Sequence, residues 1–346
     1  MDRSDIAFLS ASALASAIES KQVSPVEAVE AYLERIERID PKVNSYITVL
    51  YDDARRDAKS AEAEIQRGQY RGPLHGIPIA LKDQIHTKGI RTTDASKIRT
   101  DFVPEEDATV VVNLKKAGAI ILGKLNMSEF ALGDPQSSAF GPARNPWDLE
   151  RSPGTSSSGS GAATAARLCA TSLGEDTGGS IRGPAANCGL VGLRPTWGRV
   201  SRYGVDGAGW SVDTIGPISR TTEDCAITIG GIAGYDAKDP YTRQVPVPDY
   251  RKALTGDIRG LRVGVVRELF DTEELGLNPQ LRQAVLTAAG LLGELGAEVK
   301  DVSLPLAAQC GYITRAMTHV ERVSLHPDWL RERPQDYHHN TRVAFM

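Results

Sequence analysis

Residues 152–182 read SPGTSSSGSGAATAARLCATSLGEDTGGSIR, and this segment decides how the chain folds. It holds two hydroxyl-rich glycine turns, at 154–161 and 177–180, joined by a run of small apolar residues. Glycine lets backbone N–H groups approach a ligand closely, and serine offers a hydroxyl that can attack or relay a proton. Such a composition is typical either of a flexible linker or of a site. The apolar helix formers at 162–173 favour a turn, helix, strand and turn inside a folded domain.

The length and composition of the whole chain narrow the class of protein. The 346 residues suggest one large or two ordinary domains, and a net charge of −4 gives no reason to expect nucleic-acid or membrane binding. No apolar run approaches 20 residues, and the N-terminus lacks the pattern of a secretory signal. The cysteines are widely scattered, which implies neither a metal site nor a disulfide framework and favours the cytoplasm: Cys169, Cys188, Cys225 and Cys310.

The pattern around the central segment predicts an α/β fold in one continuous domain. Ser24, Pro25 and Glu27 form a capping box that starts a helix, which Pro41 is expected to stop. Further expected elements are helices at 52–67, 107–117 and 279–295, strands at 119–123, 260–266 and 298–304, a loop at 126–151, and short strands at 191–196 and 200–203. The unit at 260–304 is βαβ-like but has no phosphate-binding glycine fingerprint.

One lysine stands inside an apolar strand pattern. In PLHGIPIALKDQI, residues 73–85, Ile77, Ile79 and Leu81 alternate with other residues as in a strand that ends near Lys82. The usual explanation is a strand end whose ammonium reaches water. The alternative is a buried, neutral lysine that serves as a base, because desolvation lowers a lysine pKa.

Several catalytic schemes find no support in the sequence. There is no P-loop, the GTSSS stretch at 154–158 misses the GxSxG elbow by one glycine, and no lysine follows a serine by three positions. The histidines lack zinc-binding spacing and lie outside both glycine turns, although a Ser-His-Asp triad stays open because triads assemble in space. What remains is serines in glycine turns and Lys82. A serine needs a base to become a nucleophile, and N–H groups of the 176–180 turn can stabilise an oxyanion by roughly 3–4 kcal/mol per donor.

At these residues the chain resembles the amidase signature family. The matching motifs are GIPIALKD at 76–83, PGTSSSGS at 153–160 and GEDTGGSIRGP at 174–184, and Ser156 and Ser180 stand 24 residues apart, as the family's two catalytic serines do. The flanking stretches GKLNMSEFALG, SAFGPARNPWDLERSPG, GLVGLRPTWGRVSRYG and TIGPISRTTEDCA agree as well, so the resemblance runs almost end to end.

The resemblance implies the fold in more detail. It predicts a single amidase-signature domain over residues 1–346, with an N-terminal helical region at 1–67 and an α/β catalytic body at 68–346. The body would hold a mixed, mostly parallel central β-sheet covered by helices on both faces. Family members usually continue past residue 346, so the chain is expected to lack its C-terminal part, which normally lines one wall of the substrate pocket.

The resemblance also implies the roles of the site residues. Ser180 would be the nucleophile that forms an acyl-enzyme, Ser156 would bridge it to Lys82 after a cis peptide bond, and neutral Lys82 would be the base. Asp176 and Arg182 would hold the second turn in shape, and Ser157, Ser158 and Ser160 would form the first turn or support the catalytic groups from behind. No cofactor and no metal are implied. The oxyanion hole would come from backbone N–H groups of Thr177, Gly178, Gly179 and Ser180.

Three residues depart from the family pattern. Thr155 and Ser158 stand where the family prefers glycine, and their side chains are expected to narrow the turn. Glu175 stands where a small or hydroxyl residue is usual. None of these changes removes a catalytic group.

Three functions follow as alternatives. The first is a stand-alone amidase that hydrolyses a small carboxylic amide, favoured by GAGWSVD at 207–213, because Trp210 is typical of such enzymes. The second is the glutaminase component, or A subunit, of a tRNA-dependent amidotransferase, which would work with partner subunits. The third is an inactive, truncated scaffold. We expect a cytoplasmic protein, free of membrane and of direct nucleic-acid contact, with a homodimer as an open possibility.

Overall fold

The computed structural model describes residues 3–270 and 277–346, and its internal contacts divide the chain into two compact units. The larger unit comprises Met1–Arg251 together with Thr318–Met346, and the smaller one comprises Lys252–Met317. The expected boundary at residue 67 is not visible as a division of this kind, because the N-terminal helices and the sheet share one hydrophobic core. That boundary stays a prediction.

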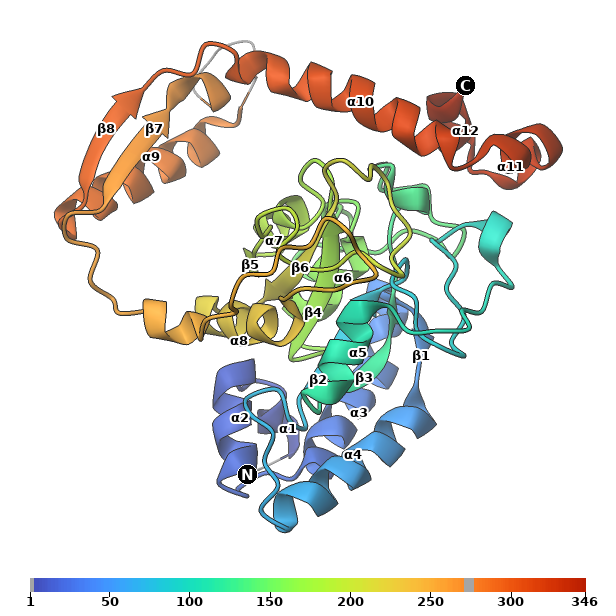
Figure 1. Ribbon diagram of the computed structural model, residues 1–346, viewed down its shortest axis with the longest axis vertical. Coiled ribbons are helices and arrows are strands. Elements are labelled where there is room, and N and C mark those ends of the chain that lie inside the picture. The colour runs from blue at the N-terminus through green and yellow to red at the C-terminus, as the bar shows by residue number, and fades with distance from the viewer. Residues whose placement is uncertain (1–2, 271–276) are drawn as a thin grey trace. The chain divides into compact units, whose positions relative to one another are not determined.

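The larger unit is built on a six-stranded sheet with the order β1-β3-β2-β4-β6-β5. Figure 1 shows β2, β3 and β4 at its centre. Its elements, in chain order, are α1 Arg3–Ile6, α2 Ala11–Glu19, α3 Pro25–Val43, β1 Tyr46–Val49, α4 Tyr51–Gln66, β2 Pro78–Lys82, α5 Thr109–Lys116, β3 Ile120–Leu125, α6 Ser158–Ala165, β4 Thr171–Asp176, α7 Arg182–Asn187, β5 Val191–Gly192, β6 Thr214–Ser219 and α8 Thr222–Ile232. After the smaller unit come the end of α10 Cys310–Ser324, α11 Pro327–Glu332 and α12 His339–Phe345.

The predicted mixed sheet with helices on both faces is confirmed, but the expectation that it is mostly parallel is wrong, because three of its five strand pairings are antiparallel. β2 runs parallel to both β3 and β4, whereas β1, β6 and β5 run antiparallel to their neighbours, so the parallel part is the centre. On β4, Ser172 contacts Ser160 and Thr164 of α6, while the preceding Thr171 contacts Thr228 of α8. Successive strand residues point to opposite faces, so α6 and α8 cover opposite faces of the sheet.

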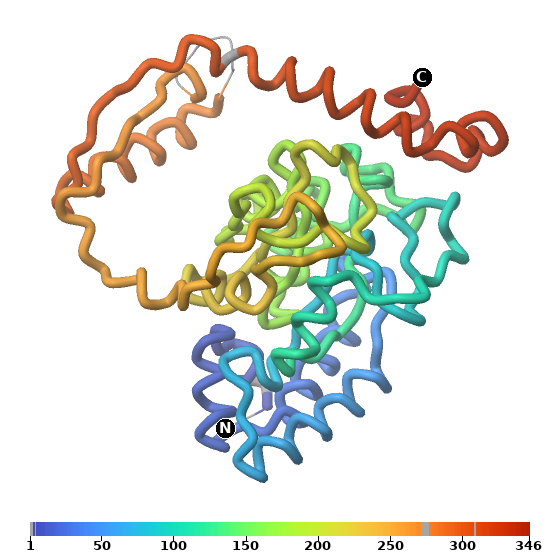
Figure 2. Tube along the Cα trace, in the orientation of Figure 1, coloured from blue at the N-terminus to red at the C-terminus, as the bar shows by residue number. Residues whose placement is uncertain are grey.

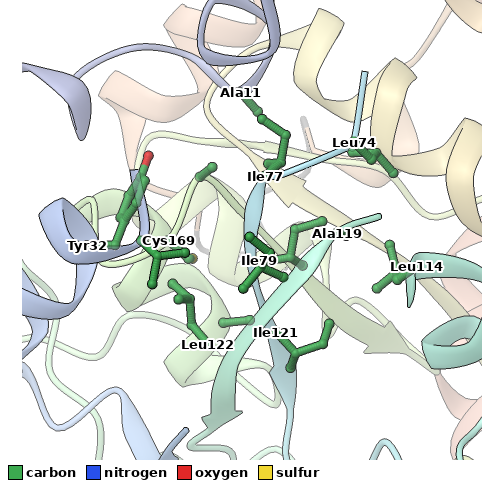
Figure 3. Packing of buried hydrophobic residues seen from close by; sticks show 14 of the residues in the cluster. Ala11, Tyr32, Leu74, Ile77, Ile79, Leu114, Ala119, Ile121, Leu122 and Cys169 are labelled. Carbon is green, nitrogen blue, oxygen red and sulfur yellow. The ribbon is translucent and has the colours of Figure 1, made fainter. Parts of the chain in front are cut away.

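The hydrophobic core lies between the central strands and the N-terminal helices. Figure 3 shows Ile77, Ile79, Ile121 and Leu122 of this region packed near Tyr32 and Cys169. The start of the chain lies beside a segment far along the sequence, α8, as the tube shows (Figure 2). There the Ser12 N–H donates to Asp224 Oδ1 at 2.9 Å. Burying apolar surface stabilises the folded state by roughly 25 cal/mol per Å². This core is therefore the main support of the strands whose ends carry the site.

Two predicted helix boundaries are wrong by a few residues. Helix α3 starts at the expected capping box but continues to Val43, because Pro41 falls in its last turn and Asn44, with φ of 53°, ends it. Helix α5 begins at Thr109 after an Ala108 cap. The carboxylate of Asp107, where the helix was expected to begin, instead accepts the Lys88 N–H at 2.8 Å.

In the sheet region, strands β1 and β6 and helices α7 and α8 were not predicted from the sequence pattern, and one expected strand is absent. Strand β6 reads TIGPIS, and its glycine and proline hide the alternation that marks a strand. Helix α8 follows it, capped by Thr221. Among the described residues, 200–203 form no strand; Val200 makes only an isolated bridge with Ala233.

The smaller unit is the predicted βαβ arrangement. Strands β7 Arg262–Val266 and β8 Glu298–Val302 pair in parallel, and α9 Pro279–Glu294 connects them (Figure 1). Residues 271–276 of this connection lie outside the described part. Over the described ranges of the chain, no helix combines the length and the apolar character that a membrane span requires.

Candidate active site

Two neighbouring strands bring the predicted site residues to one edge of the sheet. Lys82 is the last residue of β2, and Glu175 and Asp176 end β4. Because β2 and β4 are parallel, with Leu81 opposite Leu173, their carboxyl ends meet at the same edge. The Ser157 N–H donates to the Ser180 carbonyl at 3.3 Å, which places the second glycine turn directly beside the first.

A glycine in the first turn allows α6 to lie close to the backbone of Ser45 and Asn126. A Cβ added to Gly159 would lie 2.4 Å from the Ser45 carbonyl oxygen and 2.5 Å from the backbone of Asn126. Only glycine fits there without displacing backbone. Ser157 and Ser160 then tie α6 to β4, since their hydroxyls donate to the carbonyls of Glu175 and Leu173 at 3.3 and 3.0 Å. The expected supporting role of these serines is thereby confirmed.

Lys82 does not reach water, so the strand-end explanation is wrong. Its side chain is fully buried, and Nζ lies 2.7 Å from Ser156 Oγ, which is also fully buried. Burial lowers the pKa of the Lys82 ammonium below its usual range, because the charged form loses its hydration. Glu175, Asp213 and Asp176 oppose that shift by attracting the positive charge.

The two serines are placed differently. The peptide bond between Thr155 and Ser156 is cis, as the resemblance implied. Ser180 is only half-buried, in the turn that follows β4, so it is the more accessible of the two hydroxyl residues. The structure thus shows the contact between the Lys82 and Ser156 side chains directly. Ser180 is placed beside them by the hydrogen bond between the Ser157 N–H and the Ser180 carbonyl.

Asp176 organises the second turn. Its buried carboxylate accepts the Gly179 and Ile181 N–H groups at 2.7 and 3.1 Å and pairs with Arg182 at 3.0 Å and Arg194 at 3.2 Å. Burial alone would raise the pKa of Asp176, but these hydrogen bonds outweigh it and lower the pKa below its usual value. The supporting role expected of Asp176 and Arg182 is confirmed.

This arrangement alters the expected oxyanion hole. The Gly179 N–H is directed at Asp176 Oδ1, so in this conformation it does not point at a substrate. Gly179 matters through its backbone instead, because its φ of 132° is a conformation that other residues rarely adopt. Donation from Thr177, Gly178 and Ser180 to an oxyanion stays a prediction.

Glu175, noted in the sequence only as a departure from the family pattern, contacts the lysine directly. Its Oε2 lies 3.1 Å from Lys82 Nζ, and both side chains are fully buried. The Thr177 hydroxyl lies 2.9 Å from Glu175 Oε1 and 2.7 Å from Asp213 Oδ1. Asp213 was not predicted as a site residue, since its place beside β4 depends on the pairing of β4 with β6.

Asp213 and Trp210 mark a pocket on this side of the site. The pocket has a volume of about 210 Å³, and Glu175, Asp213, Trp210 and Tyr241 are among its lining residues. Of the other two departures, Thr155 donates its hydroxyl to the Gly133 carbonyl at 2.7 Å, away from the Lys82–Ser156 contact. Ser158 is buried at the start of α6.

Asp213→Asn is expected to flatten the pH dependence of stability. Burial and the charge of Glu175 raise the pKa of Asp213 to about 7, well above its value of about 3.9 in an unfolded chain. Between these values the folded protein holds a proton that the unfolded chain has released, so the free energy of unfolding falls as pH rises through that window. Asparagine does not titrate, and its amide can still accept from Ala208 and Gly209 and donate to Thr177.

Urea unfolding of both proteins at several pH values between 4 and 8 measures this effect. The wild type should lose stability relative to the variant as pH rises towards 7. Two curves that run parallel across this window would show that Asp213 titrates at its ordinary pKa.

The comparisons with known proteins agree with this fold. A model of the amidase family matches residues 27–328. The curated A subunit of the glutamyl-tRNA(Gln) amidotransferase of Geobacter metallireducens is 54% identical over 289 residues, which is 83% of this chain and 59% of that protein. Its counterpart in Moorella thermoacetica is 48% identical over 302 residues, 87% of this chain and 61% of that protein.

Solved structures of amidases and amidotransferase subunits share this fold. The native peptide amidase of Stenotrophomonas maltophilia superimposes with a TM-score of 0.84 at 35% identity, covering 94% of this chain and 68% of that one. The A subunit of the glutamyl-tRNA(Gln) amidotransferase of Thermotoga maritima gives 0.79 at 34% identity with the same coverage. The chain therefore belongs to the amidase family, whose signature the three motifs resemble. It spans about three fifths of the length of the curated relatives.

Proposed function

We propose that this protein hydrolyses a carboxylic amide to an acid and ammonia or an amine through Lys82, Ser156 and Ser180. The observation that carries the proposal is the fully buried contact of 2.7 Å between Lys82 Nζ and Ser156 Oγ. A lysine in a dry site can be neutral, and a neutral amine can accept a proton. Membership of the amidase family supports amide bonds as the target.

In the proposed reaction Ser180 attacks the amide carbonyl carbon. Its proton passes to Ser156, and the Ser156 proton passes to Lys82, so the tetrahedral intermediate forms without releasing a free proton. The proton then returns to the leaving nitrogen, and an acyl group remains on Ser180. Water hydrolyses this ester by the same relay. Backbone N–H groups of Thr177, Gly178 and Ser180 would stabilise the oxyanion.

Two observations bear on the substrate. Trp210 is 43% exposed and lines the pocket beside Glu175, which supports a stand-alone amidase acting on a small amide. The identity of 48–54% to the amidotransferase relatives supports glutamine as the amide and partner subunits as the acceptors of its ammonia. The glutaminase component of an amidotransferase is therefore at least as well supported as a stand-alone amidase. The inactive scaffold is the weakest of the three, because the buried lysine contact is intact. A cytoplasmic location and a homodimer stay predictions.

An amide panel tests the proposal and separates the candidates. Ammonia release is measured from glutamine, from amidated peptides and from small aliphatic and aryl amides, by the chain alone and with amidotransferase partner subunits added. Hydrolysis of small or peptide amides by the chain alone supports a stand-alone amidase. Glutamine hydrolysis that appears only with the partner subunits supports the amidotransferase function. No ammonia under any of these conditions would contradict the proposal.

A further inference from the structure

A continuous series of buried polar contacts leads from Lys82 away from Ser156. Lys82 Nζ contacts Glu175 Oε2 at 3.1 Å, Glu175 Oε1 contacts the Thr177 hydroxyl at 2.9 Å, and that hydroxyl contacts Asp213 Oδ1 at 2.7 Å. Glu175 is fully buried, and Asp213 is 3% exposed. The series therefore joins the proposed base to a pair of carboxyl groups screened from water.

Counting hydrogens limits the directions of the hydrogen bonds in this series. The Thr177 hydroxyl has one proton, so it donates to one carboxyl group only and must accept from the other. Asp213 Oδ2 already accepts the Ala208 and Gly209 N–H groups, both at 2.8 Å. Since burial raises the pKa of Asp213 to about 7, its Oδ1 carries a proton below about pH 7 and donates it to Thr177. Thr177 then donates to Glu175 Oε1, and Glu175 Oε2 is left facing Lys82 Nζ.

The other charged groups nearby do not replace Glu175 at the lysine. Arg322 of α10 is 6% exposed and interacts electrostatically with Glu175 and Asp213, which adds positive charge on their side of the site. Asp176 attracts Lys82 at longer range, but its oxygens are engaged by Arg182, Arg194 and the turn. Glu175 is thus the carboxylate in direct contact with Lys82 Nζ. Of the nearby groups, it most strongly opposes the lowering of the Lys82 pKa by burial.

We propose that Glu175 is the counter-ion of Lys82: its carboxylate, held by Thr177 and Asp213, stabilises the ammonium that forms when the Ser180 proton arrives through Ser156. This inference rests on the proposed role of Lys82 as the base. Glu175 is fully buried and acts through Lys82, so it is a positioning residue.

Every proton that moves during the attack of Ser180 on the amide has a donor and an acceptor. The O–H bond of Ser180 breaks as its oxygen bonds to the amide carbon, and the carbonyl π pair moves to the oxygen. Ser156 receives this proton on Oγ and gives its own to Lys82 Nζ. Glu175 stays ionised throughout and takes no proton. When the C–N bond breaks, the proton returns from Lys82 through Ser156 to the leaving nitrogen.

With Glu175 beside it, Lys82 is a stronger base, and it becomes neutral only at a higher pH. Burial alone makes the lysine a weak base, and an adjacent carboxylate restores part of its basicity. Base catalysis becomes more effective as the basicity of the acceptor rises, provided that the acceptor is unprotonated at the working pH. Removing Glu175 should therefore separate two effects: Lys82 becomes neutral at lower pH, and it accepts the proton less well.

The pH profile of kcat/KM for Glu175→Gln tests this. The limb that rises with pH should move to lower pH by about 1 to 3 units, the effect of one opposite charge at this range, and the plateau should fall. Glu175→Ser, with a shorter neutral side chain, should move the limb in the same direction. The matched control is Glu129→Gln, because Glu129 is a buried glutamate that contacts Ser96 and His338 instead. A limb that stays in place in both Glu175 variants would overturn the inference.

A second measurement does not depend on turnover. NMR titration of ¹³C-labelled lysine side chains, with the Lys82 signal assigned by its loss in Lys82→Arg, reports the lysine pKa directly. The Lys82 pKa should be lower in Glu175→Gln than in the wild type and unchanged in Glu129→Gln. If it falls while no amide is hydrolysed, the counter-ion is supported and the proposed function fails. If amides are hydrolysed and it does not move, the inference fails and the proposed function stands.

Discussion

Replacing Ser180 with alanine is expected to reduce kcat for amide hydrolysis by about 10⁶-fold, the loss seen when a serine nucleophile is removed from a catalytic triad. Without its hydroxyl no acyl-enzyme can form, and only the binding and oxyanion groups remain. Ser156→Ala and Lys82→Ala should each cost several orders of magnitude as well. In the first the proton has no bridge, and in the second it has no acceptor.

The effects of these three substitutions should not add. Ser180, Ser156 and Lys82 act as one relay, so the double variant Lys82→Ala/Ser180→Ala should be about as slow as Ser180→Ala alone. Steady-state kinetics on the best amide from the panel measures this, with Ser60→Ala as the control because Ser60 is an exposed serine on α4. Losses that multiply across the double variant would mean that lysine and serine serve separate steps.

Asp176→Ala is expected to destabilise the protein by about 3–5 kcal/mol, the range for removing one partner of a buried, hydrogen-bonded charge. The Gly179 and Ile181 N–H groups would lose their acceptor, and Arg194 would lose its nearest carboxylate. The value should fall towards the lower end, because the Arg182 side chain is 55% exposed and can turn to water. The turn that carries Ser180 would also lose its shape, so activity should fall with stability.

Urea unfolding followed by circular dichroism measures the change in stability. The matched control is Asp53→Ala, which removes the same carboxylate from an exposed ion pair with Arg56 on α4 and should leave the midpoint almost unchanged. If the two variants unfold at the same urea concentration, Asp176 does not organise the turn.

The sequence predicts the centre of the fold because local signals and global structure agree there. The capping box at Ser24 starts α3, Lys82 ends an alternating apolar strand, and the glycine turns flank a helix and a strand as expected. Strand β6 was missed, since TIGPIS carries a glycine and a proline that suppress the strand signal and is held in place by pairing with β4 and β5. Tertiary pairing, and not local preference, forms this strand.

The sequence predicts the lysine and the two serines of the candidate site, but it does not predict the carboxyl groups that surround the lysine. Three motifs nominate Lys82, Ser156 and Ser180, and the structure brings the first two into contact. That Glu175 faces the lysine follows only from the register of β2 against β4, and that Asp213 joins it follows from the register of β4 against β6. The Gly179 N–H was misassigned because a glycine turn in a sequence does not reveal which way each N–H points.

The most direct test of the account is where a serine-reactive fluorophosphonate attaches. Peptide mass spectrometry of the treated protein should find one adduct, on Ser180, and Lys82→Ala should abolish it, because the unassisted hydroxyl is a poor nucleophile. An adduct on another residue, or an unlabelled Ser180 in a preparation that hydrolyses amides, would contradict the account.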